Sequence, residues 1–381
     1  MKICIDARWI FPEISGIGTY TREILSQLTK LDSRNEYLVL FDNVSVRKRI
    51  WHETGAESSE NFSAVTLDYG VFSVSGQFKL PFLLKKQSVD IYHSPNYMIP
   101  FLAFPRNRPG RTRCIVTIHD VIPLLFREHA PKSRKTRLFP LYIRVMRECI
   151  ARADVIVTDS RASAEDIVDC LLPRRTNSEK VHPIYLGVNS RFKPRREQAS
   201  KTDATVLYVG RMDPYKNLET LFRAIAGLTG RISAPLSLVI AGNRDPRYPE
   251  ISRMPAEFGI EKNVRWTGYL TDDDLLKLYQ ESSVLAHPSR YEGFGLTILE
   301  AMACGLPVVC SNAGPLPEIA GGAAIMVDPE DPGGFADGIM KTLTDPDTAS
   351  AMKQKGIENA ARFTWRKSAS ELLDLYSMIA E

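Results

Sequence analysis

Residues 284–309 read VLAHPSRYEGFGLTILEAMACGLPVV, and this stretch carries the clearest structural pattern in the chain. The apolar run at 284–288 is short enough for a buried strand, and the residues from Leu296 onward are helix formers. Gly305 stands where a C-terminal helix cap belongs, and a second apolar run begins directly after it. A strand, a helix and another strand in this order are typical of a parallel sheet covered by helices.

The same alternation extends in both directions from this stretch. In the second half, strands are also expected at 205–210, 237–242, 264–268 and 307–311, with helices at 218–226 and 272–281. In the first half, strands are expected at 2–6, 37–41, 90–94, 115–120 and 155–160, with helices at 19–28 and 163–171. The sequence therefore predicts an α/β protein with two Rossmann-like, doubly wound parallel sheets.

A polar, charged stretch at 193–203 (KPRREQASKTD) separates the two patterns and is typical of a linker. We expect an N-terminal Rossmann-like domain over residues 1–193 and a C-terminal Rossmann-like domain over 194–364. A last amphipathic helix, within 365–381, is expected to pack back on the N-terminal domain. Ligands of open parallel sheets bind beyond the carboxyl ends of the strands, so two facing domains would surround one cleft with residues that follow strands.

Composition favours a cytoplasmic globular enzyme. The chain has 381 residues, of which 44% are hydrophobic and 25% charged, and this is ample for two domains. No uninterrupted apolar stretch reaches the ~18 residues of a membrane span, and the N-terminus lacks a secretion signal pattern. The six cysteines are scattered without a Cys-x-x-Cys pair, which favours buried reduced thiols over disulfides or a metal cluster.

The net charge of +4 conceals an asymmetry between the two halves. Residues 1–193 hold 29 Lys and Arg against 20 Asp and Glu, a balance of +9, and the remainder has a balance of −5. Much of the excess lies between Arg106 and Arg147, partly on a segment with apolar residues at helical spacing. Such a helix can bind an anionic membrane peripherally, at its inner face, or it can simply be a solvated helix over an ordinary core. No feature favours nucleic acid.

The glycine loop of the opening stretch suits a phosphate or a sugar. Gly293 and Gly295 allow a ligand to approach the backbone, and the free amides at the start of the following helix suit a phosphate. Glu292 lies in the loop and Glu300 in the helix, and carboxylates are good acceptors for paired sugar hydroxyls. A surface loop charge and a solvated helix position are the alternative interpretation of these two residues.

The segment EGFGLTILEAMACGLPVV resembles the E-x7-E signature of the large retaining glycosyltransferase family 4, and the resemblance extends along most of the chain. It implies the two-domain fold called GT-B, a nucleotide-sugar donor, retention of the anomeric configuration and no required metal or other cofactor. By this resemblance, Glu292 would contact hydroxyls of the donor sugar and Glu300 the ribose. The donor would also contact the residues between them, Gly293, Phe294, Gly295, Leu296 and Thr297.

A second motif, LYVGRMDPYKN at 207–217, places two cations directly after an expected strand. Fixed cations near a leaving nucleoside diphosphate stabilise its developing negative charge. The family places this pair on the diphosphate, so the resemblance gives that role to Arg211 and Lys216. Asn217 stands where the common form of the family has glycine, and Asn also tolerates a left-handed conformation.

A third motif, IVTIHDVIP at 115–123, ends an expected strand in His119 and Asp120. His119 matches a histidine that reaches the transferred sugar in related enzymes, and Asp120 would either orient it or approach the acceptor. His93 and His287 also follow expected strands and are possible cleft-lining residues. The segment at 158–161 (TDSR) resembles the family's strand-end segment near the cleft.

A fourth motif, SGIGTY at 15–20, resembles the family's N-terminal glycine loop, which makes Gly16 and Gly18 candidate donor contacts. A Gly-x-Gly pair also fits a dinucleotide-binding oxidoreductase, the main alternative function. No complete G-x-G-x-x-G follows the first strand directly, and that alternative leaves the other motifs unexplained. A glycosidase would also need two carboxylates, but it would have no use for phosphate-binding groups.

Three further residues, Gly268, Tyr269 and Leu270, follow an expected strand and could contact the nucleotide base. No cluster of His, Cys and Asp has metal-ligand spacing. The combination HDVIPL at 119–124 with EGFG resembles bacterial surface-polysaccharide mannosyltransferases, which implies GDP-mannose as the donor. Another nucleotide hexose, such as UDP-glucose, remains an alternative. The implied acceptor is a glycan or a lipid-linked saccharide. The resemblance also implies that the N-terminal domain (1–193) binds the acceptor and the C-terminal domain (194–364) binds the nucleotide sugar.

Overall fold

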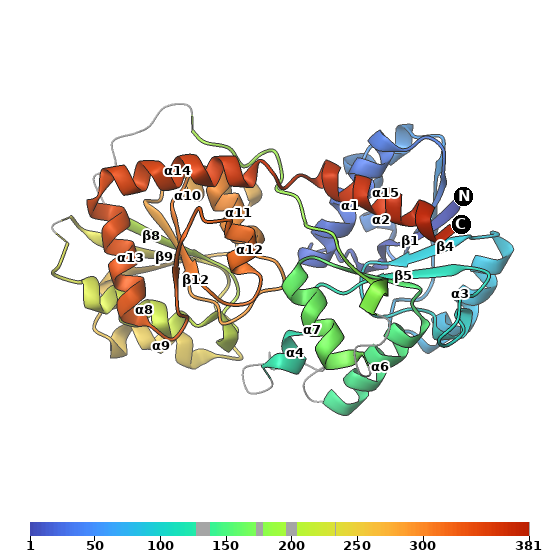
Figure 1. Ribbon diagram of the computed structural model, residues 1–381, viewed down its shortest axis with the longest axis horizontal. Helices are drawn as coiled ribbons and strands as arrows, with labels where there is room; N and C mark the ends of the chain where they lie inside the picture. Colours follow the sequence, from blue (N-terminus) through green and yellow to red (C-terminus); the bar gives the residue numbers. More distant parts are fainter. Residues whose placement is uncertain (127–137, 173–177, 196–203, 233, 381) are drawn as a thin grey trace. The chain divides into compact units, whose positions relative to one another are not determined.

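The computed structural model describes residues 1–126, 138–172, 178–195, 204–232 and 234–380, which form two compact units (Figure 1). Unit 1 comprises Met1–Val121, Leu138–Gly187 and Trp365–Glu381, and unit 2 comprises Ile122–Arg137 and Val188–Thr364. Unit 1 thus ends at Gly187, before the charged stretch that suggested a boundary at 193. The short segment after His119 and Asp120 is grouped with unit 2.

Unit 1 is built on a seven-stranded sheet in which every neighbouring pair of strands is parallel. The strand order is β3-β2-β1-β4-β5-β6-β7, with bounds β1 Lys2–Asp6, β2 Glu36–Phe41, β3 Phe62–Thr66, β4 Ile91–Ser94, β5 Arg113–Thr117, β6 Val155–Thr158 and β7 Val181–Pro183. Its helices are η1 Ala7–Trp9, α1 Gly16–Leu31, α2 Val44–Glu53, η2 Ala56–Ser58, α3 Val74–Lys86, η3 Phe101–Ala103, α6 Phe139–Arg152, α7 Arg161–Leu171, η5 Ser178–Lys180 and α15 Trp365–Ala380.

The chain adds strands on one side of β1 as far as β3 and then adds the remaining strands on the other side. This change determines which face of the sheet each helix covers. Because crossovers between parallel strands are right-handed, α1 and α2 cover one face while α3, α6 and α7 cover the other (Figure 1). The reversal between β1 and β4 is the position at which such sheets bind ligands.

The C-terminal helix α15 belongs to unit 1, where it packs against α1. The Tyr376 hydroxyl lies 2.6 Å from Nδ1 of the buried His93, and the Ser368 hydroxyl donates to the Tyr185 carbonyl. Trp365 contacts the ring of Tyr20. The last residues of the chain therefore complete the core of the unit that contains its first residues.

Unit 2 is built on a six-stranded parallel sheet of the same kind. The order is β10-β9-β8-β11-β12-β13, with bounds β8 Ala204–Val209, β9 Leu236–Ala241, β10 Val264–Gly268, β11 Val284–His287, β12 Val308–Ser311 and β13 Ile325–Val327. Its helices are α4 Ile122–Leu125, η6 Pro214–Lys216, α8 Leu218–Leu228, α9 Pro249–Glu257, η7 Glu261–Asn263, α10 Asp272–Glu281, α11 Leu296–Ala303, α12 Leu316–Ala320, α13 Pro332–Thr344 and α14 Pro346–Ala360. The core lies between the sheet and α8 and α13.

The expected strands are present, with ends that differ by a few residues. The largest difference is at β5, which ends at Thr117 rather than at Asp120, so His119 already lies in the loop. β3, β7 and β13 were not predicted. All six cysteines are free thiols, and five of them are buried. Among the helices of the described residues, none has both the length and the apolar character needed to cross a bilayer.

Candidate active site

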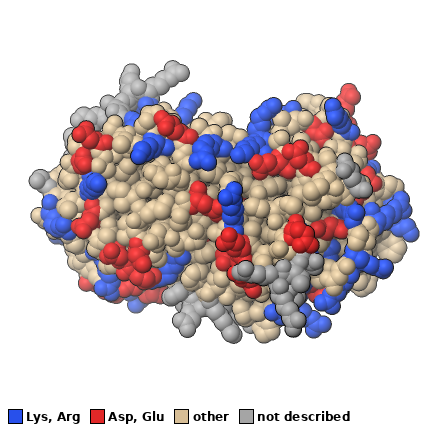
Figure 2. Space-filling model, viewed as in Figure 1, with Lys and Arg blue, Asp and Glu red and all other residues tan. Residues whose placement is uncertain are grey.

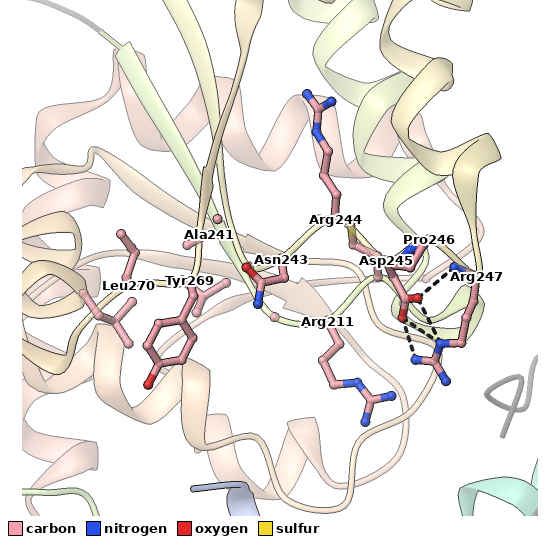
Figure 3. A pocket seen from close by; sticks show the side chains of 15 residues that line it. Arg211, Ala241, Asn243, Arg244, Asp245, Pro246, Arg247, Tyr269 and Leu270 are labelled. Atoms are coloured by element: carbon pink, nitrogen blue, oxygen red, sulfur yellow. Dashed lines mark hydrogen bonds and ion pairs between the residues drawn. The ribbon is translucent and has the colours of Figure 1, made fainter. Parts of the chain in front are cut away.

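A cavity of about 770 Å³ in unit 2 lies beyond the carboxyl ends of β8, β9 and β10 (Figure 3). Its lining comes mainly from the loops that follow these strands, including Arg211, Asn243, Arg247, Tyr269 and Leu270. Four residues proposed from the sequence thus line one cavity: Arg211, Gly268, Tyr269 and Leu270. A cavity of this volume can hold a small-molecule ligand of nucleotide size.

Two glycines let the loops after β8 and β9 approach one another. Gly242 has a φ of 152°, and a Cβ atom there would clash with the Gly210 carbonyl oxygen. The Gly242 amide also donates to the Gly268 carbonyl at 3.1 Å, which fixes the loop after β10. The floor of the cavity is therefore backbone, and a side chain at Gly242 would force the loops apart.

Two arginines project into this region around one buried carboxylate. The Asp213 side chain is completely buried, and it lies 2.9 Å from the Arg211 guanidinium and 3.6 Å from that of Arg247. Neither carboxylate oxygen accepts a hydrogen bond from the described residues, so these contacts are ion pairs without hydrogen-bond geometry. Burial raises the pKa of Asp213, although both guanidinium groups oppose that effect. Asp245 binds Arg247 from the other side, with Nε to Oδ1 at 2.9 Å (Figure 3).

Glu292 is fixed by a cation and an imidazole. Lys216 Nζ lies 2.6 and 2.8 Å from its two carboxylate oxygens, and His287 Nε2 lies 2.7 Å from Oε1. Burial alone would raise the pKa of Glu292, but the Lys216 charge and the His287 hydrogen bond lower it far below its usual value. The Glu292 carboxylate is therefore ionised, and His287 Nε2 must carry the proton that it donates.

Tyr208 of β8 joins these two groups of residues. Its hydroxyl donates to the Arg211 carbonyl at 2.7 Å, and its ring stacks against His287 with centroids 6.3 Å apart. Arg211 and Lys216, which the family resemblance placed on a common ligand, thus have different carboxylate partners, and Tyr208 contacts Arg211 and the imidazole that binds the partner of Lys216.

Helix α11 begins at Leu296, as predicted, after Gly295 with a φ of 112°. A Cβ atom at Gly295 would lie 2.9 Å from a Leu316 side-chain carbon, so this turn requires glycine. Glu300 lies within α11, where it accepts a 2.9 Å hydrogen bond from the Tyr279 hydroxyl. Burial raises the pKa of Glu300 to about 7, although the Tyr279 bond opposes the shift.

In unit 1, His119 is held by partners on both ring nitrogens. Nδ1 lies 2.7 Å from Asp159 Oδ2, and Nε2 lies 3.0 Å from the Pro95 carbonyl oxygen. Burial alone would lower the pKa of His119, but the Asp159 charge and these hydrogen bonds raise it above its usual value. A carbonyl oxygen can only accept, so Nε2 carries a proton. Asp159 therefore orients His119 through Nδ1, a role that the sequence had suggested only for the neighbouring Asp120.

The other sequence candidates in unit 1 occupy different environments. His93 is 2% exposed and binds Thr117 and Tyr376, and burial, with the charge of His119, lowers its pKa to about 3. It is a neutral core residue and does not line a cleft. Gly16 and Gly18 form the first turn of α1 rather than a loop, and the Ser15 hydroxyl caps this turn.

Over the described residues, no group of three or more His, Cys, Asp or Glu side chains could hold a metal ion. The charged groups of the candidate site are instead paired with one another, as Lys216 is with Glu292 and Arg211 with Asp213.

Two glycosyltransferase profiles match the chain one after the other. The profile described as Glycosyltransferase Family 4 matches residues 14–192, and the profile described as Glycosyl transferases group 1 matches residues 189–359. The chain is a family 4 glycosyltransferase. Its substrate is accordingly a nucleotide sugar, and a dinucleotide-binding oxidoreductase is excluded.

Curated relatives and solved structures agree with this family. The glycosyltransferase is 26% identical to O-antigen chain mannosyltransferase B of Escherichia coli over the full length of both chains (100% of each). It is 30% identical to the serotype-specific mannosyltransferase WbdA of Escherichia coli over 76% of its own length, and it spans 36% of that longer protein. The structure of HepE from Anabaena in complex with UDP and glucose matches with a TM-score of 0.73 at 19% identity, covering 99% and 100% of the two chains. The GT-B fold predicted from the sequence is confirmed.

Several residues around these candidates were missed by sequence reasoning. Asp213 and Arg247 flank Arg211, Tyr279 binds Glu300, and His287 was considered only as a lining residue. Asp213 lies inside a motif that was quoted for its cations, and a buried acid between two cations was a signal available there. Arg247 lies 36 positions from Arg211 in the sequence, and no local pattern links the two.

Proposed function

We propose that this glycosyltransferase transfers a mannosyl group from GDP-mannose to a hydroxyl of a glycan or lipid-linked saccharide, with retention of the anomeric configuration. The observation that carries the proposal is the arrangement at the carboxyl ends of β8, β9 and β11. There, the guanidinium groups of Arg211 and Arg247 border a nucleotide-sized cavity, and an ionised carboxylate is fixed nearby. A diphosphate and a developing sugar cation need groups of these two kinds.

The nucleotide is proposed to bind in the cavity after β8, β9 and β10. Arg211, whose side chain is 63% exposed, and Arg247 would contact the diphosphate, because guanidinium groups form paired hydrogen bonds to phosphate oxygens. The ring of Tyr269 is 79% exposed, and with the backbone of Gly268 and Leu270 it would border the base. Glu300 would accept hydrogen bonds from the ribose.

Glu292 is proposed to stabilise the reacting sugar. As the diphosphate leaves, the anomeric carbon acquires oxocarbenium character, and a fixed carboxylate in a dry setting favours that charge. Lys216 balances Glu292 in the free enzyme and would also lie near the departing phosphate. The loop from Gly293 through Phe294 to Thr297 leads from this carboxylate into α11, whose first amides can bind donor oxygens.

His119 is proposed to bind a hydroxyl of the transferred sugar by donating from Nε2. The protein already engages both ring nitrogens, so that hydroxyl would have to take the place of the Pro95 carbonyl. This arrangement suits a fixed donor better than a general base. The acceptor proton would instead pass to the leaving diphosphate, and Asp120 and the first turn of α1 with Gly16 and Gly18 would border the acceptor.

The choice of GDP-mannose as the donor rests on the names of the proteins that this chain resembles. Two relatives are named mannosyltransferases, whereas HepE was solved with UDP and glucose, so UDP-glucose is the second candidate. We further propose that the enzyme is cytoplasmic, acts peripherally at the inner face of a membrane, binds no nucleic acid and needs neither a metal nor another cofactor.

The proposal can be tested by assaying the purified enzyme with a panel of nucleotide sugars and saccharide acceptors. GDP-mannose should raise the melting temperature and be consumed with release of GDP, and the product should keep the α configuration of the donor by NMR. UDP-glucose should do neither. EDTA should leave the rate unchanged. Turnover of UDP-glucose in place of GDP-mannose, or a loss of activity in EDTA that Mg²⁺ restores, would contradict the corresponding part of the proposal.

A further inference from the structure

Helix α3 of unit 1 is apolar on two opposite sides, and only one of them is buried. Gly76, Leu80 and Leu84 recur every four residues and face the core. Val74, Phe78 and Phe82 recur at the same interval two positions away, about 200° around the helix, and they are 75%, 58% and 76% exposed. A helix face of this kind normally has a binding partner.

Two more exposed side chains extend this face. Phe72, 60% exposed, precedes α3 and packs edge-on against the buried Trp9 at 5.5 Å. Leu102, 62% exposed, belongs to η3, which the Gln77 side chain ties to α3 through bonds to the Ile99 carbonyl and the Phe101 amide. We call the set Phe72, Val74, Phe78, Phe82 and Leu102 the apolar stripe.

Basic side chains accompany the apolar stripe. Lys85 and Lys86 are exposed at the end of α3, whereas the exposed Lys79 pairs with Asp68 at 3.0 Å. Figure 2 shows Lys and Arg gathered along the right-hand edge of the view, where Figure 1 draws α3. Helix α6, which contacts η3, adds an exposed surface of the same composition, with Leu138 and Leu141 beside Arg144 and Arg147. Exposed apolar and cationic groups thus alternate across α3, η3 and the start of α6.

The basic excess of the sequence is only partly available at the surface between 106 and 147. Arg106 pairs with Glu148 at 3.6 Å and Arg113 with Asp154 at 3.2 Å. The cations between Arg127 and Arg137 lie outside the described residues. The apolar stripe on α3 had not been considered from the sequence, because Phe78 and Phe82 fit a core helix equally well.

We propose that the apolar stripe docks this enzyme on an anionic lipid bilayer, with its phenylalanines inserted at the headgroup boundary and its lysines on the anionic lipids. Charge favours a bilayer over a second copy of the chain. A symmetric dimer would use this same basic patch on both copies and so bring like charges together, whereas an anionic bilayer would compensate them.

The direction of α3 connects this surface with the proposed acceptor, so the inference rests in part on the proposed function. Helix α3 links the end of β3 to the start of β4, so its first residue lies toward the carboxyl edge of the sheet. His119 and Asp159 lie at that same edge of unit 1. A bilayer along α3 would present a lipid-linked saccharide to the edge where the acceptor is expected.

Sedimentation with vesicles of phosphatidylcholine, alone or mixed with phosphatidylglycerol, tests the docking surface. The enzyme should bind the mixed vesicles, and the Phe78→Ser, Phe82→Ser double variant should lower the partition coefficient about tenfold or more, since each buried phenylalanine contributes strongly. The Lys85→Gln, Lys86→Gln variant should lose the preference for phosphatidylglycerol and its dependence on salt.

The matched control is Val44→Ser, which removes a 51% exposed apolar side chain from α2, on the other face of the sheet. It should bind vesicles like the unmodified enzyme. Equal binding by the phenylalanine variant and the unmodified enzyme, or a dimer that this variant dissociates without affecting vesicle binding, would overturn the proposal. Mannosyl transfer to a soluble acceptor should be unchanged in all variants. Its absence from the unmodified enzyme would instead contradict the proposed function and leave the vesicle result standing.

Discussion

The bond between His287 and Glu292 is expected to govern the rate of transfer rather than nucleotide affinity. His287→Phe keeps a ring beside Tyr208 but removes the N–H group that holds Glu292. A carboxylate with one fewer anchor stabilises the developing sugar cation less well, so kcat should fall on the order of tenfold to a hundredfold. Steady-state kinetics and calorimetric titration with GDP measure the two quantities separately.

Glu292→Gln is the comparison for this variant, because it removes the carboxylate charge itself and should lower kcat at least as far. Both variants should bind GDP, which carries no sugar, like the unmodified enzyme. If His287→Phe weakened GDP binding as strongly as it lowered kcat, a specific positioning role for His287 would be wrong.

Glu300 predicts a pH dependence of nucleotide binding near neutrality. Burial raises its pKa to about 7, so a fall in pH from about 8 to about 6 protonates it in the free enzyme. A protonated carboxyl group is a weaker acceptor for ribose hydroxyls, so the affinity for GDP should decrease as the pH falls. The same raised pKa means that the folded chain binds more protons than the unfolded chain between 4.5 and 7, so stability declines as the pH rises through that range.

Calorimetric titration of GDP across this pH range measures the effect, and Glu300→Gln serves as the control. The amide is neutral throughout, so this variant reports only the titration of the GDP phosphates and of other groups. An equally steep pH dependence in the unmodified enzyme and in Glu300→Gln would exclude Glu300 as its source.

Arg247 is expected to contribute to diphosphate binding together with Arg211. Loss of a charge-assisted hydrogen bond costs about 1.5–3 kcal/mol, so Arg247→Ala should weaken GDP binding about tenfold to a hundredfold. Because both arginines pair with Asp213, the double variant should lose less than the product of the two single effects. Arg253→Ala, an exposed arginine of α9 outside the cavity, is the control. GDP affinity equal to that of the control variant would remove Arg247 from the site.

At the scale of elements, strand burial explains which parts of the fold were predictable. The central strands β8, β11 and β12 are covered on both faces and appear in the sequence as short apolar runs. Three of the four edge strands, β3, β7 and β13, were missed. β7 and β13 are three residues long, and β3 carries an exposed serine, so neither length nor hydrophobicity distinguished them.

In the candidate site, the sequence predicted the positions of several functional residues but not the residues that they bind. The motifs located Arg211, Lys216, Glu292 and Glu300 directly after strands or in the following helix, because that position is a property of the fold. The partner of Arg211, Asp213, lies in the same motif, whereas Glu300 is bound by Tyr279 of α10 and Arg247 comes from the loop after β9, which no local pattern could predict. Asp159 shows the distinction: its position after β6 was recognised, whereas its bond to His119 depends on the pairing of β5 with β6.

Because the loops after β8 and β9 lie so close together, Gly242→Ala is expected to disturb both loops. The added Cβ atom would meet the Gly210 carbonyl, and alanine at a φ of 152° is strained, so unit 2 should lose about 1–3 kcal/mol of stability and bind GDP more weakly. Gly227→Ala on α8 is the control, because nothing lies near its Cβ position and alanine favours helices by about 0.5–1 kcal/mol. Urea unfolding and GDP titration compare the two variants. A Gly242→Ala protein as stable as Gly227→Ala would contradict the predicted clash.

At the scale of the whole molecule, the chain leaves unit 1, forms unit 2 and then returns to unit 1 through α15. The amphipathic pattern of 365–379 indicated a helix that was expected to pack back on the N-terminal domain, but the pattern did not identify the residues that it contacts. Leu372, Tyr376 and Ile379 are buried, and the bond from Tyr376 to His93 joins the helix to the strand β4. The integrity of the unit that holds His119 therefore depends on the last residues of the chain.

This organisation predicts that a ligand and a mutation act on different units. GDP binds the folded form of unit 2 in our proposal, so it should raise the melting temperature of the unit 2 transition in a calorimetric scan. Leu372→Ala, at a position 1% exposed in α15, should lower the unit 1 transition by an amount corresponding to about 2–5 kcal/mol, because it leaves a cavity against the core of that unit. Asp374→Ala, an exposed change in the same helix, should alter neither transition. GDP affinity should be the same in the unmodified enzyme and in both variants. A scan in which GDP and Leu372→Ala shift one and the same transition would show that the two units unfold together, and the independent stability of the donor-binding unit would be refuted.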